Sequence, residues 1–210
     1  LLVVADGMGG HNSGEVASDL ATQTILQFAQ KMLGGARQMV PEGADPRLSV
    51  RGRQLEHFIK GANTMIYEKG RAFPKDAGMG TTVVAVLADA QSMTVAHVGD
   101  SRAYLFRQGQ LQALTSDHSL TGDQVRRGLI SVEDASRSNL QNILTRALGA
   151  EKEVLVDVSD HPLLAGDTVL LASDGLMKMV DDDAVARTME REPSSQRAVD
   201  SLIAQARAAG

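Results

Sequence analysis

Three short apolar runs along the chain each end at an aspartate that stands beside glycine. Runs of this length, rich in Val, Leu, Ala and Thr, predict buried strands. A carboxylate at the tip of such a strand lies at the edge of the core, and the glycine beside it lets a ligand or a second backbone approach closely. The runs and their aspartates are residues 1–5 with Asp6, residues 94–98 with Asp100, and residues 168–172 with Asp174.

Helical periodicity follows the first apolar run. Apolar residues three and four positions apart over residues 16–32 predict a long helix. A second pattern of this kind over residues 55–66 predicts another helix, which ends near Gly70. Residues 34–47 lie between them and contain three glycines and two prolines, which predict a loop.

The middle of the chain is rich in short strand patterns, and their close spacing favours an antiparallel meander. Residues 116–145 are polar, with short helical patterns, and form either a flap over a site or a helical connection. The order of elements predicts an α+β fold, with helices covering antiparallel sheets. The predicted later strands are residues 81–87, 92–98, 103–107, 111–115, 154–158 and 168–172, and the predicted last helices are residues 181–190 and 195–209.

The composition of the chain argues against several classes of function. The length of 210 residues allows one large domain or two small ones. The absence of cysteine excludes disulfide and thiolate chemistry and is compatible with a reducing cytoplasm, where we expect the protein to act. A net charge of −5 without a basic block argues against a nucleic-acid partner. No apolar stretch approaches the roughly 20 residues that span a bilayer, so we expect no membrane partner.

The aspartates at the strand tips carry the candidate chemistry. Hard oxygen ligands from separate strand ends are what a Mg²⁺ or Mn²⁺ site requires, and the alternative is that each aspartate caps a turn. The glycine loop at residues 8–10 is compatible with an anion-binding nest or a turn. It lacks the Lys-Ser/Thr pair of a P-loop and the spacing of a dinucleotide fingerprint, and the aspartate before it favours a cation.

Six motifs in order along the chain add a family resemblance. They are residues 6–11 (DGMGGH), 78–82 (GMGTT), 97–104 (HVGDSRAY), 114–119 (LTSDHS), 144–149 (LTRALG) and 170–176 (LLASDGL). The set resembles the bacterial form of the protein phosphatase 2C family, the metal-dependent serine/threonine phosphatases. The resemblance implies a single catalytic domain over residues 1–210: an antiparallel β-sandwich flanked by helices on both sides, in four αββα layers, with a flap at about residues 116–145.

The resemblance also assigns metal-ligand roles by position. Asp6 resembles the carboxylate that bridges two core metals, and the carbonyl of Gly7 resembles a ligand to one of them. Asp174 resembles another ligand of the core pair. Asp100 resembles the residue that, with Asp174, holds a third and weaker metal in bacterial members. The implied cofactors are Mn²⁺ or Mg²⁺, two in the core and a third beside them.

The implied reaction is hydrolysis of phosphoserine or phosphothreonine by a water that bridges two cations, without a phosphoenzyme. His11 is a candidate general acid and substrate contact by this resemblance, and the alternative is a surface or turn residue. The implied partners are a phosphorylated protein and, by analogy, a serine/threonine kinase or its targets.

Other polar residues have structural interpretations. His97 lies within a predicted strand and is expected to be packed, and His118 is expected to pair across a turn with Asp117. Arg102 follows Asp100 closely, and we expect it to steady the motif through carboxylate hydrogen bonds. Thr81 and Thr82 are expected to be strand residues behind the site.

The pattern departs from the family at both ends. Members of the family have an N-terminal strand with an Arg that binds phosphate, and a C-terminal Asp-Asn pair that supplies one core metal ligand. Neither feature finds a match within these residues. We therefore expect a domain that is incomplete at both termini. The alternative function is a non-catalytic phosphatase-like binding module or an inactive fragment, and a nuclease is disfavoured by the acidic balance.

Overall fold

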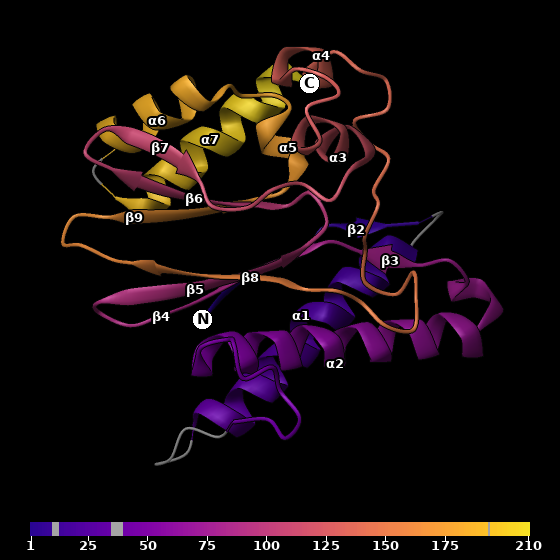
Figure 1. Ribbon diagram of the computed structural model, residues 1–210. Coiled ribbons are helices and arrows are strands. Elements are labelled where there is room, and N and C mark those ends of the chain that lie inside the picture. The colour runs from indigo at the N-terminus through magenta and orange to yellow at the C-terminus, as the bar shows by residue number, and fades with distance from the viewer. Residues whose placement is uncertain (10–12, 35–39, 193) are drawn as a thin grey trace.

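Two antiparallel sheets face each other in the computed structural model, which describes residues 1–9, 13–34, 40–192 and 194–210. Helices cover the outer face of each sheet (Figure 1), which confirms the predicted α+β fold. The helices are α1 (Ser13–Leu33), α2 (Val50–Ala72), the 3-10 turn η1 (Pro74–Asp76), α3 (Leu120–Arg126), α4 (Val132–Ser136), α5 (Asp174–Met177), α6 (Asp182–Arg191) and α7 (Ser195–Ala209). The strands are β1 (Leu2–Val4), β2 (Gly7–Met8), β3 (Gly80–Thr81), β4 (Val83–Ala88), β5 (Ser92–Val98), β6 (Arg102–Arg107), β7 (Gln110–Ala113), β8 (Asp157–Pro162) and β9 (Thr168–Ala172).

The first sheet has the order β1–β4–β5–β8, and every pairing in it is antiparallel. Side chains alternate along β4: Val83, Ala85 and Leu87 pack toward α1 and α2, while Val84 and Val86 pack toward the second sheet. Because both faces of this strand are covered, its sequence is apolar at every position rather than at every second one.

The second sheet has the order β7–β6–β9 and is also antiparallel. Ala103 and Leu105 of β6 face the first sheet, and Tyr104 between them faces α6 and α7 with Leu170, Val185 and other apolar residues. Three apolar interfaces thus separate four layers, helices on sheet on sheet on helices. A two-stranded ribbon of β2 and β3 lies beside them.

The two long helices pack tightly because a glycine stands where they cross. A Cβ atom at Gly61 of α2 would lie 2.4 Å from the ring of Phe28 in α1. Ser49 begins α2 by accepting the backbone N–H of Gly52 at 3.0 Å, so the first turn has a side-chain cap. Leu55, fully buried, anchors the apolar face of α2 on the first sheet.

The predicted four-strand meander is wrong. β5 pairs with β4 and β8, and the next strand, β6, belongs to the other sheet. The chain crosses between the sheets in three residues, 99–101, where Gly99 has a φ of 105°. Close spacing along the chain indicates neighbouring strands, but it does not tell whether the next strand pairs in the same sheet or lies in the facing sheet.

The strand predicted at residues 154–158 is displaced to Asp157–Pro162. Val154, Val156 and Val158 do alternate, because they pack against the helix-side core. Backbone pairing with β5 begins only at Asp157, opposite His97, since β5 ends one residue later. The alternation is therefore genuine, but it extends beyond the pairing partner.

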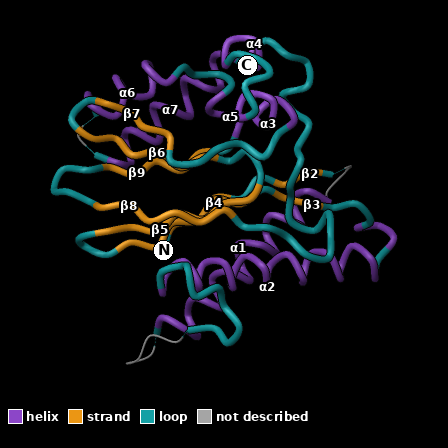
Figure 2. The backbone as a smooth tube through the Cα atoms, in the orientation of Figure 1, coloured by secondary structure: helices purple, strands orange, loops and turns teal. Residues whose placement is uncertain are grey.

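Residues 116–145 contain the predicted short helices, α3 and α4, which lie with their loops beside α5 (Figure 2). An isolated bridge between Ser119 and Leu144 closes the base of the segment. Among the described residues, no helix is both long and apolar enough to cross a membrane.

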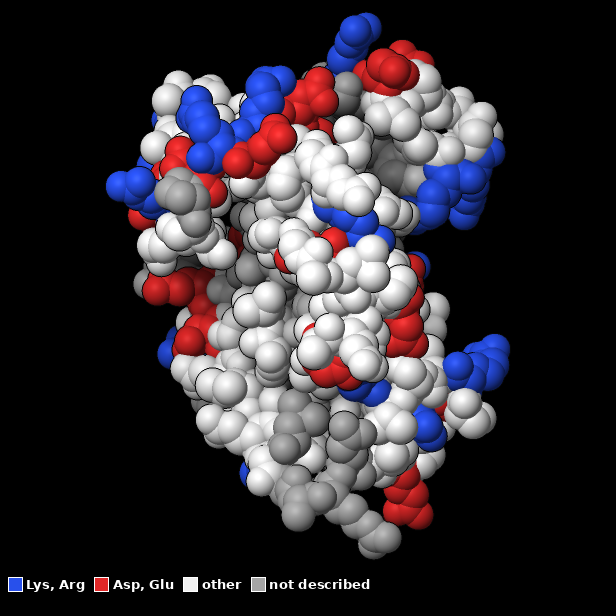
Figure 3. Space-filling view, turned by 90° about the vertical axis from the view of Figure 1, so that its left-hand side faces the viewer, with Lys and Arg blue, Asp and Glu red and all other residues white. Residues whose placement is uncertain are grey.

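Two ion pairs join neighbouring segments at the end of the sandwich that carries the β6–β7 and β8–β9 connections. Arg107 holds Asp167 through two hydrogen bonds of 2.8 and 2.7 Å, and Arg51 meets Asp89 at 2.5 Å. Figure 3 shows acidic and basic side chains next to one another along the upper part of the face it displays.

Candidate metal centre

Strand register brings Asp6, Asp100 and Asp174 to one end of the sandwich. In the first sheet, the last residue of β1 pairs with the second of β4, and the first of β4 pairs with the last of β5. In the second sheet, the first residue of β6 pairs with the last of β9. The short crossover from β5 to β6 joins the two sheets at this end and carries Asp100. Asp6 follows β1 and Asp174 follows β9, and both strands end there as well.

Asp6 is fixed through its backbone. Its N–H donates to the hydroxyl of Thr82 at 3.1 Å, and its carbonyl accepts from the Thr82 N–H and the Thr81 hydroxyl, both at 2.9 Å. The next residue, Gly7, approaches the start of α1 so closely that a Cβ atom would lie 1.9 Å from the carbonyl oxygen of Gly14. Any larger residue at Gly7 would push β2 away from the helix.

Asp100 lies in the crossover, and the residue before it is held on both sides. A Cβ atom at Gly99 would lie 2.6 Å from the Cβ of Thr82. The Gly99 N–H donates to Nδ1 of His118 at 3.1 Å, and the His118 N–H donates back to the Gly99 carbonyl at 2.9 Å. The hydroxyl of Ser101, just after Asp100, bonds that of Thr82 at 2.7 Å, so Thr82 connects the supports of Asp6 and Asp100.

Asp174 is the first residue of α5. One of its carboxylate oxygens accepts a hydrogen bond from Nζ of Lys178, four residues later. The same ammonium donates to Oδ1 of Asn142 at 2.6 Å. Asp174 is therefore linked through a lysine to the segment at 116–145.

The surroundings of Asp6 and Asp100 disfavour the ionised form of both carboxyl groups. Burial, and then the charge and hydrogen bond of Asp174, raise the pKa of Asp6. Burial, followed by the charges of Asp174 and Asp117, raises the pKa of Asp100 to about 6. The charge of Lys178 acts in the opposite direction on both groups. Negative charge therefore exceeds positive charge at this end of the sandwich.

The donor set fits a divalent cation of the Mg²⁺ or Mn²⁺ type. Hard carboxylate oxygens are the ligands these ions prefer, and like charges held together are stabilised when a cation enters between them. A Mg²⁺ ion commonly takes only one or two protein carboxylates and keeps several waters. The excess of carboxylate over lysine charge is the structural observation that supports this fit.

A cavity of about 560 Å³ opens beside Asp100 and Asp174. Its far wall is formed by residues of α3 and α4, including Gly122, Arg126 and Val132. The site therefore has room next to it for a group larger than water, between the sandwich and segment 116–145.

Arg102 is confirmed as a carboxylate partner. Its Nε and Nη2 atoms donate to the two carboxylate oxygens of Asp117, both at 2.7 Å, and this hydrogen bonding raises the pKa of the guanidinium. The predicted pairing of His118 with Asp117 is wrong, because Asp117 is turned toward Arg102. His118 is 1% exposed and points into the interior, and His97 is packed as predicted.

A second cluster of potential ligands, His97, His118 and Asp157, lies nearby. One nitrogen or oxygen of each lies within 4.8 Å of the others. The two rings stack with centroids 4.5 Å apart, and Nε2 of His118 lies 3.2 Å from Oδ2 of Asp157. Asp157 also accepts from Arg146 at 2.6 Å. Sequence reasoning did not find this cluster, because its residues come from separate segments and have no local signal.

Hydrogen bonds in this second cluster assign its protons. Nδ1 of His118 accepts from the Gly99 amide, so its Nε2 carries the proton. Nε2 of His97 lies 3.0 Å from the carbonyl oxygen of Ser116, which only accepts, so that nitrogen is protonated too. Burial lowers the pKa of both histidines, that of His118 to about 4. Both imidazole rings are neutral, Nδ1 of His118 is occupied by the Gly99 amide, and the Asp157 carboxylate is paired with Arg146, so these donors are already engaged within the protein.

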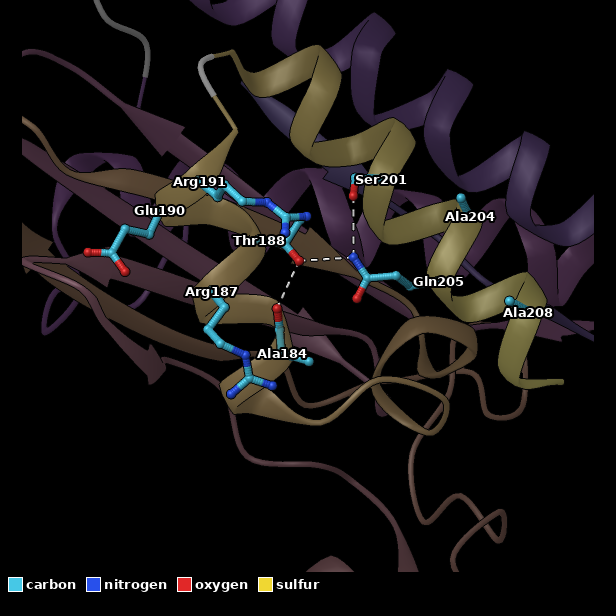
Figure 4. Close-up of a pocket in the computed structure, with 9 residues that line it drawn as sticks. All are labelled: Ala184, Arg187, Thr188, Glu190, Arg191, Ser201, Ala204, Gln205 and Ala208. Atoms are coloured by element: carbon cyan, nitrogen blue, oxygen red, sulfur yellow. Dashed lines mark hydrogen bonds between the residues drawn. The ribbon is translucent and has the colours of Figure 1, made fainter.

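A larger groove, of about 710 Å³, lies between α6 and α7. Figure 4 shows that Gln205 of α7 donates to the hydroxyl of Thr188 in α6 at 2.9 Å, which joins the two helices, and that Thr188 donates within α6 to the carbonyl of Ala184 at 2.9 Å. None of the three aspartates lines it. We assign the candidate chemistry to the aspartate end.

The structure therefore brings together the three aspartates that the sequence indicated, with Gly7 adjacent to Asp6. His11 lies outside the described residues. Lys178 and Asn142 were missed, although the spacing of Asp174 and Lys178, four residues apart at a helix start, is a recognised pairing signal.

Comparison with known proteins gives the family. Residues 1–205 match the family model described as protein phosphatase 2C. The chain is 36% identical to the serine/threonine phosphatase Stp of Listeria welshimeri, over all of this chain and 79% of that protein. It is 32% identical to the serine/threonine protein phosphatase PstP of Mycobacterium tuberculosis, over 90% of this chain and 34% of that protein.

Solved structures agree. The M. tuberculosis phosphatase PstP/Ppp superposes with a TM-score of 0.85 at 31% identity, over all of this chain and 82% of that one. A structure of the PstP catalytic domain described as a complex with 2 manganese ions superposes with a TM-score of 0.82 at 32% identity, over all of this chain and 81% of that one. The sequence and the fold agree, and the chain belongs to the protein phosphatase 2C family.

Proposed function

We propose that this protein is a metal-dependent protein serine/threonine phosphatase. The family and the relatives named as serine/threonine phosphatases support the reaction class. The observation that carries the proposal is the convergence of Asp6, Asp100 and Asp174 from distant segments at one end of the sandwich, with charge in excess of the nearby lysine.

Asp6 and Asp174 would hold two core cations, with the carbonyl of Gly7 as a further ligand. Asp100, with Asp174, would hold a third and weaker one. Mn²⁺ or Mg²⁺ is the proposed cofactor, by the chemistry of the donors and by the manganese complex of PstP. When bound, such ions activate a water for in-line attack on phosphorus and offset charge on the phosphoryl oxygens.

The chain's own residues position the reacting groups. Thr82 fixes the backbone of Asp6 and, through Ser101, the turn that carries Asp100. The cavity beside Asp100 and Asp174 would receive the phosphorylated segment of a protein, with α3 and α4 shaping its far wall. His11 is the proposed general acid and substrate contact.

The proposed substrate is a phosphorylated protein, such as a serine/threonine kinase or one of its targets, and the proposed place of action is the cytoplasm. We propose a single catalytic domain over residues 1–210, in which residues 116–145 form a flap. The competing proposal is a phosphatase-like module that binds phosphoprotein without turnover. Retention of all three aspartates favours catalysis.

Hydrolysis of an aryl phosphate and of a phosphothreonine peptide, with and without Mn²⁺, tests the proposal. We expect a Mn²⁺-dependent rate that a chelator removes and that Asp174→Ala abolishes. Asp183→Asn, an exposed change in the first turn of α6, is the matched control and keeps the rate. Binding of the peptide without turnover, in a chain extended to the length of its relatives, would favour the binding module.

A further inference from the structure

Lys178 occupies an unusual position at the aspartate site. Its ammonium donates to Asp174 and, at 2.6 Å, to the side-chain oxygen of Asn142. Asp174 begins α5, and Lys178 is its C-terminal cap residue. Asn142 belongs to segment 116–145, which forms the far wall of the cavity. One side chain therefore joins a candidate cation ligand to the segment that covers the site.

Lys178 also differs from the other basic residues that line the cavity. Arg102 is committed to Asp117 and to the hydroxyl of Tyr104. Arg126 bonds the carbonyl of Asp117 and the side chain of Asp123. Of the three basic side chains that line this cavity, Lys178 is the one that bonds an aspartate of the candidate site.

The Lys178 ammonium and a divalent cation compete for the same charge. An oxygen of Asp174 that accepts from Lys178 is less available to a metal, and a cation at that carboxylate repels the ammonium. The Lys178 side chain is 28% exposed and that of Asp174 is 35% exposed, so the ammonium has water to move into. Asn142 is exposed as well, so its hydrogen bond to Lys178 can be exchanged for water.

We propose that Lys178 is a built-in counter-ion of the aspartate site, which holds segment 116–145 through Asn142 and releases it when a divalent cation displaces the ammonium. This inference rests on the proposed metal-dependent function. It adds a link from cation binding to the wall of the substrate cavity. By reciprocity, whatever weakens the link between Lys178 and Asn142 must favour cation binding.

Two variants separate the charge of Lys178 from the tether, which is its hydrogen bond to Asn142. Lys178→Gln removes the charge, and we expect Mn²⁺ to bind about tenfold more tightly, the size expected for one charge acting on a divalent cation across a largely aqueous site. Asn142→Ala keeps the charge and removes the tether, and we expect a smaller gain of about two- to fivefold. Lys178→Arg keeps the charge and is the matched control, with affinity close to the wild type.

The measurements are Mn²⁺ titration by calorimetry and hydrogen exchange of segment 116–145, both on the full chain. We expect Mn²⁺ to speed exchange near Asn142 in the wild type, and exchange to be fast without Mn²⁺ in Asn142→Ala. If Lys178→Gln binds Mn²⁺ as the wild type does, or if Mn²⁺ leaves exchange near Asn142 unchanged, the inference is wrong while the proposed function stands. If the wild type binds no Mn²⁺, the proposed function fails and the inference fails with it.

Discussion

Two clusters of potential metal ligands lie at the same end of this molecule, and they are opposite in character. In the first, Asp6, Asp100 and Asp174 crowd their negative charges, and the pKa values of Asp6 and Asp100 rise. In the second, His97 and His118 are neutral, and each nitrogen that carries a proton faces an oxygen. Proximity of donors alone would rank the second cluster as the better site.

The difference shows that neighbouring donors indicate a cation site when their negative charge is not balanced within the protein. The aspartates have more negative charge than Lys178 can balance, so a divalent cation stabilises them. Two donors of the histidine cluster are already engaged within the protein: Nδ1 of His118 accepts from the Gly99 amide, and Asp157 is paired with Arg146. The role of the cluster is to hold Gly99 and thereby the turn that carries Asp100.

Removing an aspartate of the first cluster is expected to have the largest effect on activity. Asp6→Asn keeps the size of the side chain but removes one charge and one proposed bridging oxygen. Loss of a hydrogen-bond partner behind a metal ligand commonly costs 10–100-fold, so we expect loss of the ligand itself to reduce Mn²⁺-dependent hydrolysis by at least about 100-fold. The assay is kcat/KM with an aryl phosphate, and Asp183→Asn serves as the control.

An unchanged rate in Asp6→Asn would remove Asp6 from the proposed site. The fold should survive the change, because Asp6 is held by its backbone bonds to Thr81 and Thr82, not by its carboxylate. A melting curve of the variant close to that of the wild type checks this point.

Thr82→Val is expected to have an intermediate effect. The change preserves the shape of the side chain but removes the hydroxyl that accepts from Asp6 and bonds Ser101. Leaving buried groups unpaired costs about 1–3 kcal/mol of stability. Because both Asp6 and the turn of Asp100 lose a support, we also expect kcat to fall by about tenfold or more.

Thr82→Ser is the matched control, since it restores the hydroxyl without the methyl group. We expect it to recover most of the rate. Equal rates in Thr82→Val and the wild type would show that Thr82, between β3 and β4, is only a packed residue.

The histidine cluster is expected to affect stability through pH. Burial, and then the charge of His97, lower the pKa of His118 to about 4, from 6.5 for an ordinary histidine. Between these values the unfolded chain binds more protons than the folded one, so the contribution of His118 to stability is complete above about pH 6.5 and is lost as the pH falls toward 4. The loss is on the order of 3 kcal/mol.

His118→Asn tests this prediction, because the Asn side-chain oxygen can still accept the Gly99 amide. Denaturant unfolding from pH 7 to pH 4, without divalent cations, should show a shallower loss of stability in the variant than in the wild type. Parallel profiles in the two proteins would mean that His118 is not buried in its neutral form. Carboxylates that do not contact His118 contribute equally to both profiles and cancel in the difference.

Much of the fold follows from local sequence patterns. The long helices show helical spacing, and β4 and β5 are apolar runs because both of their faces are covered. The meander could not be excluded locally, because the three-residue crossover at Gly99 is as short as a hairpin turn. The extent of β8 was misjudged, because alternation reports burial and not backbone pairing.

Part of the candidate site was also predictable from local sequence patterns, and part was not. The three aspartates were predictable, because each stands at or just beyond the end of an apolar run. The bond from Lys178 to Asn142, 36 residues earlier in the chain, was not, and neither was the bond from Thr82 to Ser101. Such contacts depend on how segments are packed together, and the sequence around each residue carries no sign of them.

Titration of free Mn²⁺ by electron paramagnetic resonance tests the central claim most directly. Three forms of the full chain would be compared: the wild type, the double variant Asp6→Asn with Asp174→Asn, and the double variant His97→Asn with Asp157→Asn. The account predicts that the wild type and the second double variant bind Mn²⁺, and that the first does not. Binding retained in the aspartate double variant and lost in the histidine-cluster variant would contradict it.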